Sequence, residues 1–586
     1  MIALSRCLFG LLLGAAALPA QADEGPFRFV PADSTAVFKL SGPAAFAEAF
    51  AGTRLRQLLD GPTLGPLFGQ ANETFMQMAA VGQVPFDPEE VVEAVQAYSG
   101  DALAVVMLDK EALVDAMGAG VVPDFAVCLV FGGDGHTDLR AVAEFFELRA
   151  EEENVVLTDV TVGEHRLRVD MAPGLGSAQL SVPQVIGEDL VMLVGTDLEQ
   201  QAAWFLEPQA SWEPDEEFVG AQMGARVDWQ AVTSMIEEGM LVGGGPDADV
   251  GLEVFELTGL MSVRSLQLTV AADESDVVGT ASLGFNDQPR GLFEAIMAGG
   301  NQKRPELLAY LPPSAPAFWA GDFRFAAIYD LVQEFGLLAE ATAGMNPIAE
   351  GEEMFSEMMR VRLKEDLLDH MGDQALTLVD PAAATSLFPE DELDEVSGPL
   401  AGNCAAWSLR DGRAFGASLE TALRSRGLHV ARKREEYQGE QINRINLLGL
   451  LDLEYVVTED LLVLGDGSCE YSRRLLRQVL DERAARRRGE PVGELPKGVD
   501  DLLSRMPPDW SSLTAMFMPD YIQVALSVFE LLQQSPFAGM GAADPDLDMI
   551  RQMLTGLATD MRAAGLEFLV STVTETADGL VAQVRW

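Results

Sequence analysis

Histidine, the side chain most often used for proton transfer and metal binding, is rare in this chain and widely spaced. The four histidines are His136, His165, His370 and His429, and none of them lies in an HExxH or HxH pattern. Each is therefore predicted to be solvated or hydrogen-bonded within the fold. The sequence also contains no CxxC pair. These spacings predict no metal site, no cofactor and no catalytic histidine.

The cysteines that follow the N-terminal segment offer little more chemistry. Cys128 and Cys404 each lie in a strand-like apolar run, so we expect both to be buried as small hydrophobic side chains. Cys469 follows the polar residues 465–468 and is the one candidate for a reactive thiol. Spacing alone does not decide whether Cys404 and Cys469 form a disulfide bond. We therefore expect a fold that does not depend on disulfides.

Two segments have the composition of a ligand-binding loop but lack its pattern. Residues 243–245 are consecutive glycines, but the acidic residues after them would repel a phosphate. Residues 544–548 begin as a D-x-D-x-D calcium loop, yet Met549 replaces the turn-forming glycine, so an acidic helix start is the better interpretation. No G-x-S-x-G elbow or Walker A pattern occurs. No catalytic or cofactor-binding residue is assigned.

One segment is locally basic. Seven arginines occur at helical spacing: Arg473, Arg474, Arg477, Arg483, Arg486, Arg487 and Arg488. Cations near the C-terminal end of a helix complement its dipole, which is the simpler interpretation. The alternative is a docking surface for an acidic partner or for the acidic first half of the chain.

The overall charge limits the partners. The 39 basic and 92 acidic side chains give a formal charge of −53, which argues against binding to nucleic acid because phosphate contacts need clustered Lys and Arg. An apolar content of 48% is enough for several cores and too high for a disordered acidic chain. A protein or an apolar ligand is a partner that the sequence leaves open, without identifying it.

Residues 1–22 have the pattern of a secretory signal peptide. Arg6 precedes an apolar run over residues 8–18, and Ala20 and Ala22 fit an A-x-A cleavage site. That run is too short for a comfortable membrane span, and no later stretch predicts a transmembrane segment in the mature chain. We therefore expect the mature protein to be extracytoplasmic, either periplasmic or secreted.

The elements that would position these residues occur twice along the chain. Residues 27–40 match residues 308–321, because each segment has an apolar residue before a proline and then an alternating strand. A Glu-Asp-Leu turn before an apolar strand recurs at residues 188–190 and 459–461. Several such matches in one order are typical of an internal repeat.

The repeat predicts two homologous units at residues 23–290 and 306–586, joined by a linker at residues 291–305. The alignment of the two copies pairs Cys128 with Cys404. Short strands joined by tight turns predict a mainly antiparallel sheet in each unit, with helices packed on one face. The fold class that we expect is α+β.

The opening strand marked by proline, the strand–helix block and the Glu-Asp-Leu strand resemble a group of secreted bacterial proteins of unknown function with a duplicated α+β unit. The resemblance covers most of the mature chain. It implies an extracytoplasmic location and a repeated α+β body, and it transfers no catalytic residue.

The repeat and the lack of a catalytic motif in the sequence predict an exported, non-enzymatic protein that binds other molecules or has a structural role in the cell envelope. Two alternatives stay open. One is a carrier that holds an apolar ligand between the two units. The other is a hydrolase whose catalytic residues come together only in the folded chain.

Overall fold

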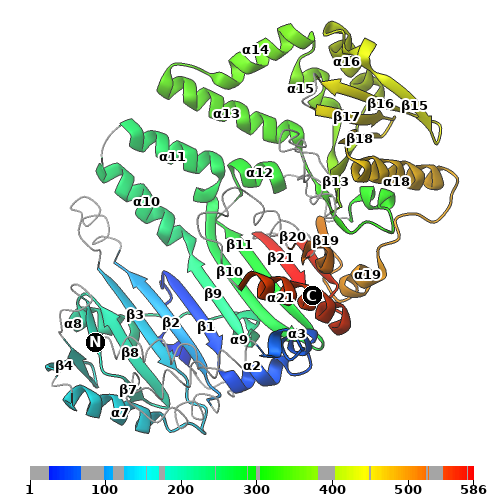
Figure 1. Cartoon of the computed structure of the whole chain (residues 1–586). Coiled ribbons are helices and arrows are strands. Elements are labelled where there is room, and N and C mark those ends of the chain that lie inside the picture. Colours follow the sequence, from blue (N-terminus) through cyan, green and yellow to red (C-terminus); the bar gives the residue numbers. More distant parts are fainter. Residues whose placement is uncertain are drawn as a thin grey trace. The chain divides into compact units, whose positions relative to one another are not determined.

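The computed structural model describes residues 26–66, 98–109, 124–152, 155–170, 178–243, 246–286, 288–297, 304–380, 403–447, 451–522, 526, 546–576 and 579–586. It divides into two compact units (Figure 1). Unit 1 comprises Met1–Asp60, Gly65–Leu252 and Met261–Asn286, and unit 2 comprises Gly61–Leu64, Glu253–Leu260 and Asp287–Trp586. The predicted signal peptide at residues 1–22 lies outside the described residues.

Unit 1 is built on an antiparallel sheet with the strand order β11-β10-β9-β1-β2-β3-β8, part of which lies side by side in Figure 1. Beyond β8 the sheet continues through β6 to β5 and β4, and the short β7 also pairs with β8. The strands are β1 (Ala36–Ser41), β2 (Asp101–Leu108), β3 (Phe125–Phe131), β4 (Leu157–Val162), β5 (His165–Asp170), β6 (Gln179–Ser181), β7 (Gln184–Ile186), β8 (Asp189–Gly195), β9 (Met223–Asp228), β10 (Val263–Asp273) and β11 (Asp276–Phe285).

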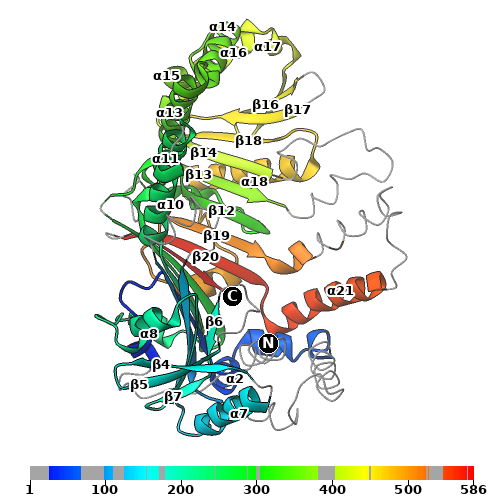
Figure 2. The same ribbon diagram turned by 90° about the vertical axis from the view of Figure 1, so that its left-hand side faces the viewer.

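Unit 2 is also built on an antiparallel sheet, with the order β21-β20-β19-β12-β13-β14-β18-β17-β16-β15. Figure 2 shows β16 to β20 of this unit stacked in that order. The strands are β12 (Ala317–Asp322), β13 (Met371–Val379), β14 (Asn403–Leu409), β15 (Lys433–Tyr437), β16 (Glu440–Leu447), β17 (Leu451–Val457), β18 (Leu461–Asp466), β19 (Ser512–Phe517), β20 (Phe568–Glu575) and β21 (Gly579–Arg585). Together the two sheets give the α+β architecture that the sequence predicts.

Helices occur between the strands of both units, and a short 3-10 helix precedes the first strand of each. Unit 1 contains η1 (Pro26–Phe29), α2 (Pro43–Phe50), α3 (Arg54–Leu59), α7 (Leu139–Glu152), α8 (Leu198–Leu206), α9 (Glu216–Gly220) and α10 (Trp229–Gly243), and α11 (Pro246–Thr258) has residues in both units. Unit 2 contains α12 (Gly291–Met297), η4 (Glu306–Tyr310), α13 (Phe325–Ala343), α14 (Pro347–Met359), α15 (Leu363–Asp366), η5 (Leu368–His370), α16 (Gly412–Ser425), α17 (Leu428–Ala431), α18 (Glu470–Arg487), α19 (Lys497–Leu503) and α21 (Asp546–Ala564). Part of the predicted linker, residues 291–305, is therefore helical.

Helices pack on both faces of each sheet, so the prediction of helices on one face is wrong. In β3 the side chains of Cys128 and Val130 pack with α8, whereas Leu129 and Phe131 pack with α7 on the other face. In unit 2, α18 packs against one face of β14 and β18 and α16 against the other. A strand buried on both faces is apolar at nearly every position. The run FAVCLVF of β3 has that pattern instead of an alternating one.

Helix α18 fits the sheet of unit 2 through one stripe of small and apolar side chains. Its buried residues are Ser472, Leu475, Leu476, Val479, Leu480 and Arg483. This spacing of three and four residues lines one face of a helix. The leucines and Val479 belong to the core formed with β14 and β18. Arg483 continues the same stripe, so the packing of α18 brings a guanidinium to the edge of the core.

Candidate functional site

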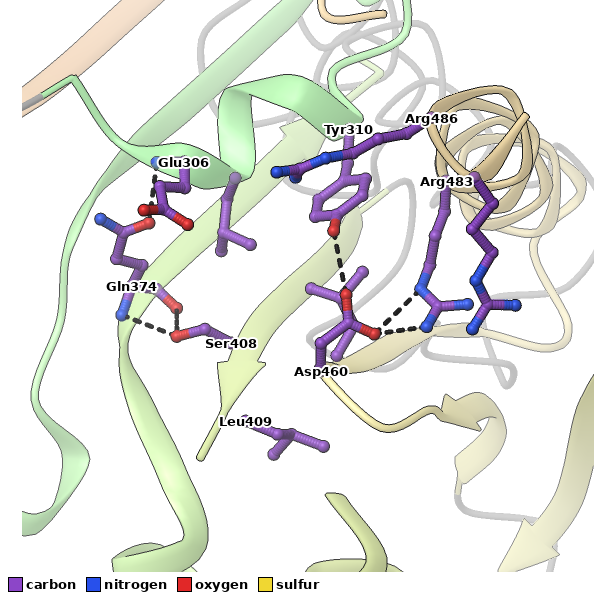
Figure 3. Close-up of a pocket in the computed structure, with 11 residues that line it drawn as sticks. Glu306, Tyr310, Gln374, Ser408, Leu409, Asp460, Arg483 and Arg486 are labelled. Atoms are coloured by element: carbon purple, nitrogen blue, oxygen red, sulfur yellow. Dashed lines mark hydrogen bonds and ion pairs between the residues drawn. The ribbon is translucent and has the colours of Figure 1, made fainter. Parts of the chain in front are cut away.

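A pocket of about 480 Å³ lies within unit 2 (Figure 3). Its walls come from η4, β13, β14, the turn that precedes β18, and the last turns of α18. Three buried leucines supply its apolar lining: Leu307, Leu409 and Leu461. The remaining lining residues are polar or charged. A volume of this size falls in the range of sites for small molecules.

One wall of the pocket is a network of hydrogen bonds centred on Asp460. The Arg483 side chain, only 4% exposed, donates from Nε to Oδ1 of Asp460 over 3.1 Å and from Nη2 to the same oxygen. The Tyr310 hydroxyl donates to Oδ2 of Asp460 over 3.0 Å. Arg483 also pairs with Glu440, which accepts a second hydrogen bond from Arg487 over 2.5 Å. Both carboxylates are thus neutralised by arginines of α18.

The network holds its members in fixed charge states. Burial by itself would raise the pKa of Asp460, but the hydrogen bonds and positive charge of Arg483, together with the hydrogen bonds from Thr458 and Tyr310, outweigh it, so this pKa lies below its ordinary value. Burial and then the neighbouring charge of Asp460 raise the pKa of Tyr310. At neutral pH the wall therefore presents a carboxylate, a neutral phenol and a guanidinium.

The opposite wall contains Glu306, Gln374 and Ser408 (Figure 3). The backbone N–H of Glu306 donates to Oε1 of Gln374 over 2.9 Å. Ser408 Oγ accepts from the Gln374 N–H over 3.1 Å and donates to the Gln374 carbonyl over 3.3 Å. The register of β13 and β14 shifts between Met371 and Ala375, and Ser408 satisfies backbone groups at this irregularity. Its hydroxyl therefore connects two strands.

Most of the arginine-rich segment is neutralised inside its own unit. Arg474 pairs with Asp380, Arg477 with Glu435 and Glu454, Arg483 and Arg487 with the carboxylates above, and Arg488 with Glu490. Arg486 differs, because its guanidinium lies over the Tyr310 ring at 5.2 Å from the centroid. The segment is thus largely an internal ion-pair network, and Arg486 is the arginine of the pocket lining that forms no ion pair with a described residue.

The four histidines do not come together in the described part of the chain. His136 is exposed in the turn after β3, and His165 begins β5. His370 ends η5 and His429 lies exposed in α17. None of them lines the pocket. Over the described residues, no group of three His, Cys, Asp or Glu side chains is arranged to hold a metal ion.

The cysteines are where the sequence predicts them. Cys128 and Cys404 are buried, on β3 and β14, and burial raises the pKa of both thiols. Cys469 lies at the N-cap of α18 and is partly exposed. All three are free thiols, so Cys404 and Cys469 are not bridged. The prediction of small buried hydrophobic side chains is confirmed for Cys128 and Cys404.

The two loop-like segments contribute nothing to the pocket. Gly243 ends α10, and the two glycines after it lie outside the described residues. Asp544 is also outside them, while Asp546 is the first residue of α21, as expected for an acidic helix start.

Sequence reasoning singled out Arg483, Arg486 and Arg487 as part of the arginine-rich segment but did not find the other residues that line this pocket. A signal was nevertheless present, because Arg483 falls on the apolar stripe of α18, where a cation needs a buried partner. The Glu-Asp-Leu turn that contains Asp460 was noticed only as part of the repeat. No pattern in the sequence joins Tyr310 to either residue.

In the described part of the chain, none of the helices combines the length and the apolar composition that crossing a membrane requires. No protein-family model and no curated protein matches this chain. Among solved structures, two crystal forms of a protein titled TP0453 show a limited likeness. Form III is 10% identical, with 48% of this chain and 87% of that chain covered and a TM-score of 0.22. Form I is 8% identical, with 48% and 86% covered and the same TM-score of 0.22.

Proposed function

We propose that this chain is an exported, non-enzymatic binding protein of the cell envelope, and that the pocket of unit 2 is its ligand site. The observation that carries the proposal is the network of Tyr310, Asp460 and Arg483. General acid–base catalysis needs a group whose pKa lies near the working pH. In this network the pKa of Tyr310 is raised and that of Asp460 is lowered, so both move away from neutrality. Fixed charges and oriented donors suit binding better than proton transfer.

The geometry of Ser408 favours binding over hydrolysis. A nucleophilic serine needs a general base within hydrogen-bond reach. The hydroxyl of Ser408 instead exchanges hydrogen bonds with the backbone of Gln374. We expect ester, glycoside and peptide substrates to show no turnover that depends on this residue. A turnover that Ser408→Ala abolishes, with the melting temperature unchanged, would establish the hydrolase alternative.

Native mass spectrometry of the gently purified full chain tests the binding function. We expect a bound small molecule, and we expect Arg486→Glu to reduce its occupancy about tenfold, because a charge-assisted hydrogen bond is worth about 1.5–3 kcal/mol. Arg488→Glu is the matched control, since Arg488 lies beside the same helix end and pairs with Glu490 outside the pocket lining. The proposal fails if no preparation retains a ligand or if both variants lose it equally.

A carrier of apolar ligands is the second candidate, and an exposed apolar row on unit 1 favours it. Phe38 of β1 lies opposite Ala225 of β9, which lies opposite Leu268 of β10. Phe38 and Leu268 are each 46% exposed. Exposed apolar side chains that adjoin one another often mark a contact surface. Extraction of the purified protein with organic solvent separates the candidates, because a carrier yields lipid and a polar-ligand protein does not.

We also propose that the two units descend from one duplicated α+β unit, with residues 291–305 as the join. The support is that the order β11-β10-β9-β1-β2-β3-β8 of unit 1 corresponds strand for strand to the order β21-β20-β19-β12-β13-β14-β18 of unit 2. In that alignment Cys128 of β3 and Cys404 of β14 lie on corresponding strands. Superposition of the separately crystallised units would test this, and a different spatial order of strands would contradict it.

Export itself is a proposal that rests on residues 1–22. Expression of the full chain in a Gram-negative host, followed by fractionation and intact-mass analysis, tests it. We expect the mature chain to begin at Asp23 and to be found outside the cytoplasm. A cytoplasmic chain that keeps Met1 would contradict the proposal.

A further inference from the structure

Two oppositely charged side chains of the pocket form no ion pair within the described structure. Glu306 lies in the first turn of η4 and is exposed. Arg486 lies in the last turn of α18 and is also exposed. Neither forms an ion pair with a described residue, whereas Arg483 and Arg487 beside them both do. The two free charges are therefore available to a ligand.

The ring of Tyr310 positions the Arg486 guanidinium without using the N–H groups at its edge. Its guanidinium lies over the ring of Tyr310, with 5.2 Å between the carbon and the ring centroid. A planar guanidinium stacked on an aromatic face still presents its N–H groups around its edge. Those groups match the two oxygens of a carboxylate. Figure 3 shows Arg486 reaching from α18 across Tyr310 toward the side of the pocket that carries Glu306.

Glu306 is fixed through its backbone and not through its side chain. Its N–H donates to Gln374 over 2.9 Å, which anchors η4 to β13. The carboxylate on this anchored backbone is a ready acceptor for an ammonium group. The buried side chains of Leu307 and Leu409 line the same pocket and offer an apolar contact.

From this arrangement we infer that the pocket takes a small zwitterion, such as a free amino acid or a short peptide. This rests on the proposed binding function. The ligand carboxylate binds Arg486, its ammonium binds Glu306, and an apolar side chain contacts the leucines. A chain with a formal charge of −53 repels a simple anion, whereas a zwitterion has no net charge to be repelled. A cavity of about 480 Å³ suits a ligand of this size.

The test is isothermal titration of the full chain with free leucine, the peptide Ala-Leu-Ala, its N-acetyl form and its C-terminal amide. We expect one of the two zwitterions to bind, and which of them binds distinguishes an amino acid from a peptide. If the peptide is the ligand, each blocked form should bind about tenfold more weakly, because it lacks one charge-assisted contact. N-acetyl-leucine and leucinamide serve the same purpose if leucine is the ligand.

Two variants assign each end of the ligand. Glu306→Gln should remove the preference for the free amine and keep the preference for the free carboxylate. Arg486→Gln should do the reverse, and Arg488→Gln should leave both preferences unchanged. Both target side chains are exposed, and circular dichroism melting checks that the variants fold.

The possible outcomes separate this inference from the proposed function. If free and blocked forms bind equally, or if native mass spectrometry finds a ligand without both charges, the zwitterion inference is wrong and the binding function stands. If no member of the panel binds and no small molecule co-purifies, both are wrong.

Discussion

Each unit has a carboxylate at or just before the start of the corresponding strand, β8 or β18. An arginine pairs with each carboxylate, but the two arginines lie on different kinds of element. In unit 1, Asp189 at the start of β8 pairs with Arg28 of η1 over 2.7 Å, and Arg28 also lies over the Phe29 ring. In unit 2, Asp460 directly before β18 pairs with Arg483 of α18. The 3-10 helix of unit 2 has Ala309 where that of unit 1 has Arg28 in the aligned copies.

The length of one helix explains the difference. Helix α8 has 9 residues and α18 has 18. At a rise of about 1.5 Å per residue, nine further residues extend a helix by roughly 13 Å. The additional turns of α18 contain Arg483 and Arg486. The cation of unit 2 thus comes from a long helix and not from the 3-10 helix, and the pocket is lined by residues of η4 and of the last turns of α18. The ion pair of unit 2 lines a pocket, and its arginine lies in the part of α18 that extends beyond the length of α8.

The two carboxylates also differ in their pKa. Burial raises the pKa of Asp189, and the Gly133 N–H and Arg28 offset this only in part. For Asp460 burial is opposed by the hydrogen bonds and charge of Arg483 and by hydrogen bonds from Thr458 and Tyr310, which together lower its pKa. The carboxylate of unit 1 therefore takes up a proton more readily than that of unit 2.

The largest expected effect comes from removing each arginine. Arg483→Met should lower the free energy of unfolding by about 2–4 kcal/mol, because a buried guanidinium is lost and two carboxylates keep their charge without it. Arg28→Met should cost about 1–2 kcal/mol, since Asp189 keeps its Gly133 hydrogen bond and accepts a proton readily. Denaturant unfolding, with hydrogen exchange read separately on β8 and β18, measures both. Equal decreases in the free energy of unfolding would show that the two ion pairs contribute equally to stability.

The variants Asp460→Asn and Asp189→Asn should change the pH dependence of the free energy of unfolding by a smaller amount, about 1 kcal/mol. For Asp460 the effect is small because its side chain is half-exposed and solvent screens its charge. The lowered pKa of Asp460 stabilises the folded chain above its unfolded pKa of about 3.9, and this contribution is lost as the pH falls. The raised pKa of Asp189 has the opposite sign, so its contribution declines as the pH rises above about 3.9.

Unfolding titrations between pH 3.5 and pH 7 check this pair. We expect Asp460→Asn to lose stability at pH 7 and to lie closer to the wild type at low pH. Asp189→Asn should be unchanged or slightly more stable at pH 7. Parallel curves for the two variants would mean that the two sites titrate alike.

The two units also differ in the polarity of one row of side chains that crosses three neighbouring strands of each sheet. The row Phe38, Ala225 and Leu268 of unit 1 is apolar. In unit 2 the corresponding row is Trp319 of β12, Thr514 of β19 and Ser571 of β20, so it is mostly polar. Apolar side chains left exposed add little to stability and instead favour contact with other molecules.

The smallest expected effect on stability follows from this row. The double variant Phe38→Thr, Leu268→Thr should change the free energy of unfolding by no more than about 0.5–1 kcal/mol, because both side chains are half-exposed. It should, however, reduce the binding of an environment-sensitive apolar dye such as ANS. Thr514→Val in unit 2 is the reverse experiment and should increase dye binding. A large loss of stability in the double variant would show that the row is part of a core.

The local and periodic features of the fold were predictable. Apolar runs around Cys128 and Cys404 predicted buried strands, and both residues are buried on the sheet. The antiparallel α+β class followed from short strands and tight turns. Packing of helices on both faces was missed, although the run FAVCLVF, which is apolar at every position, contained the signal for it.

The sequence by itself determined the charge, the composition of the strands, the helical stripe of residues 472–483 and the burial of two cysteines, because these depend on residue type and on spacing along one element. The tertiary structure alone decided that Tyr310, Asp460 and Arg483 meet, and that Glu306 and Arg486 line one pocket. These residues are separated by long stretches of chain. Their contacts follow from strand order and from the length of α18, and neither leaves a periodic pattern in the sequence.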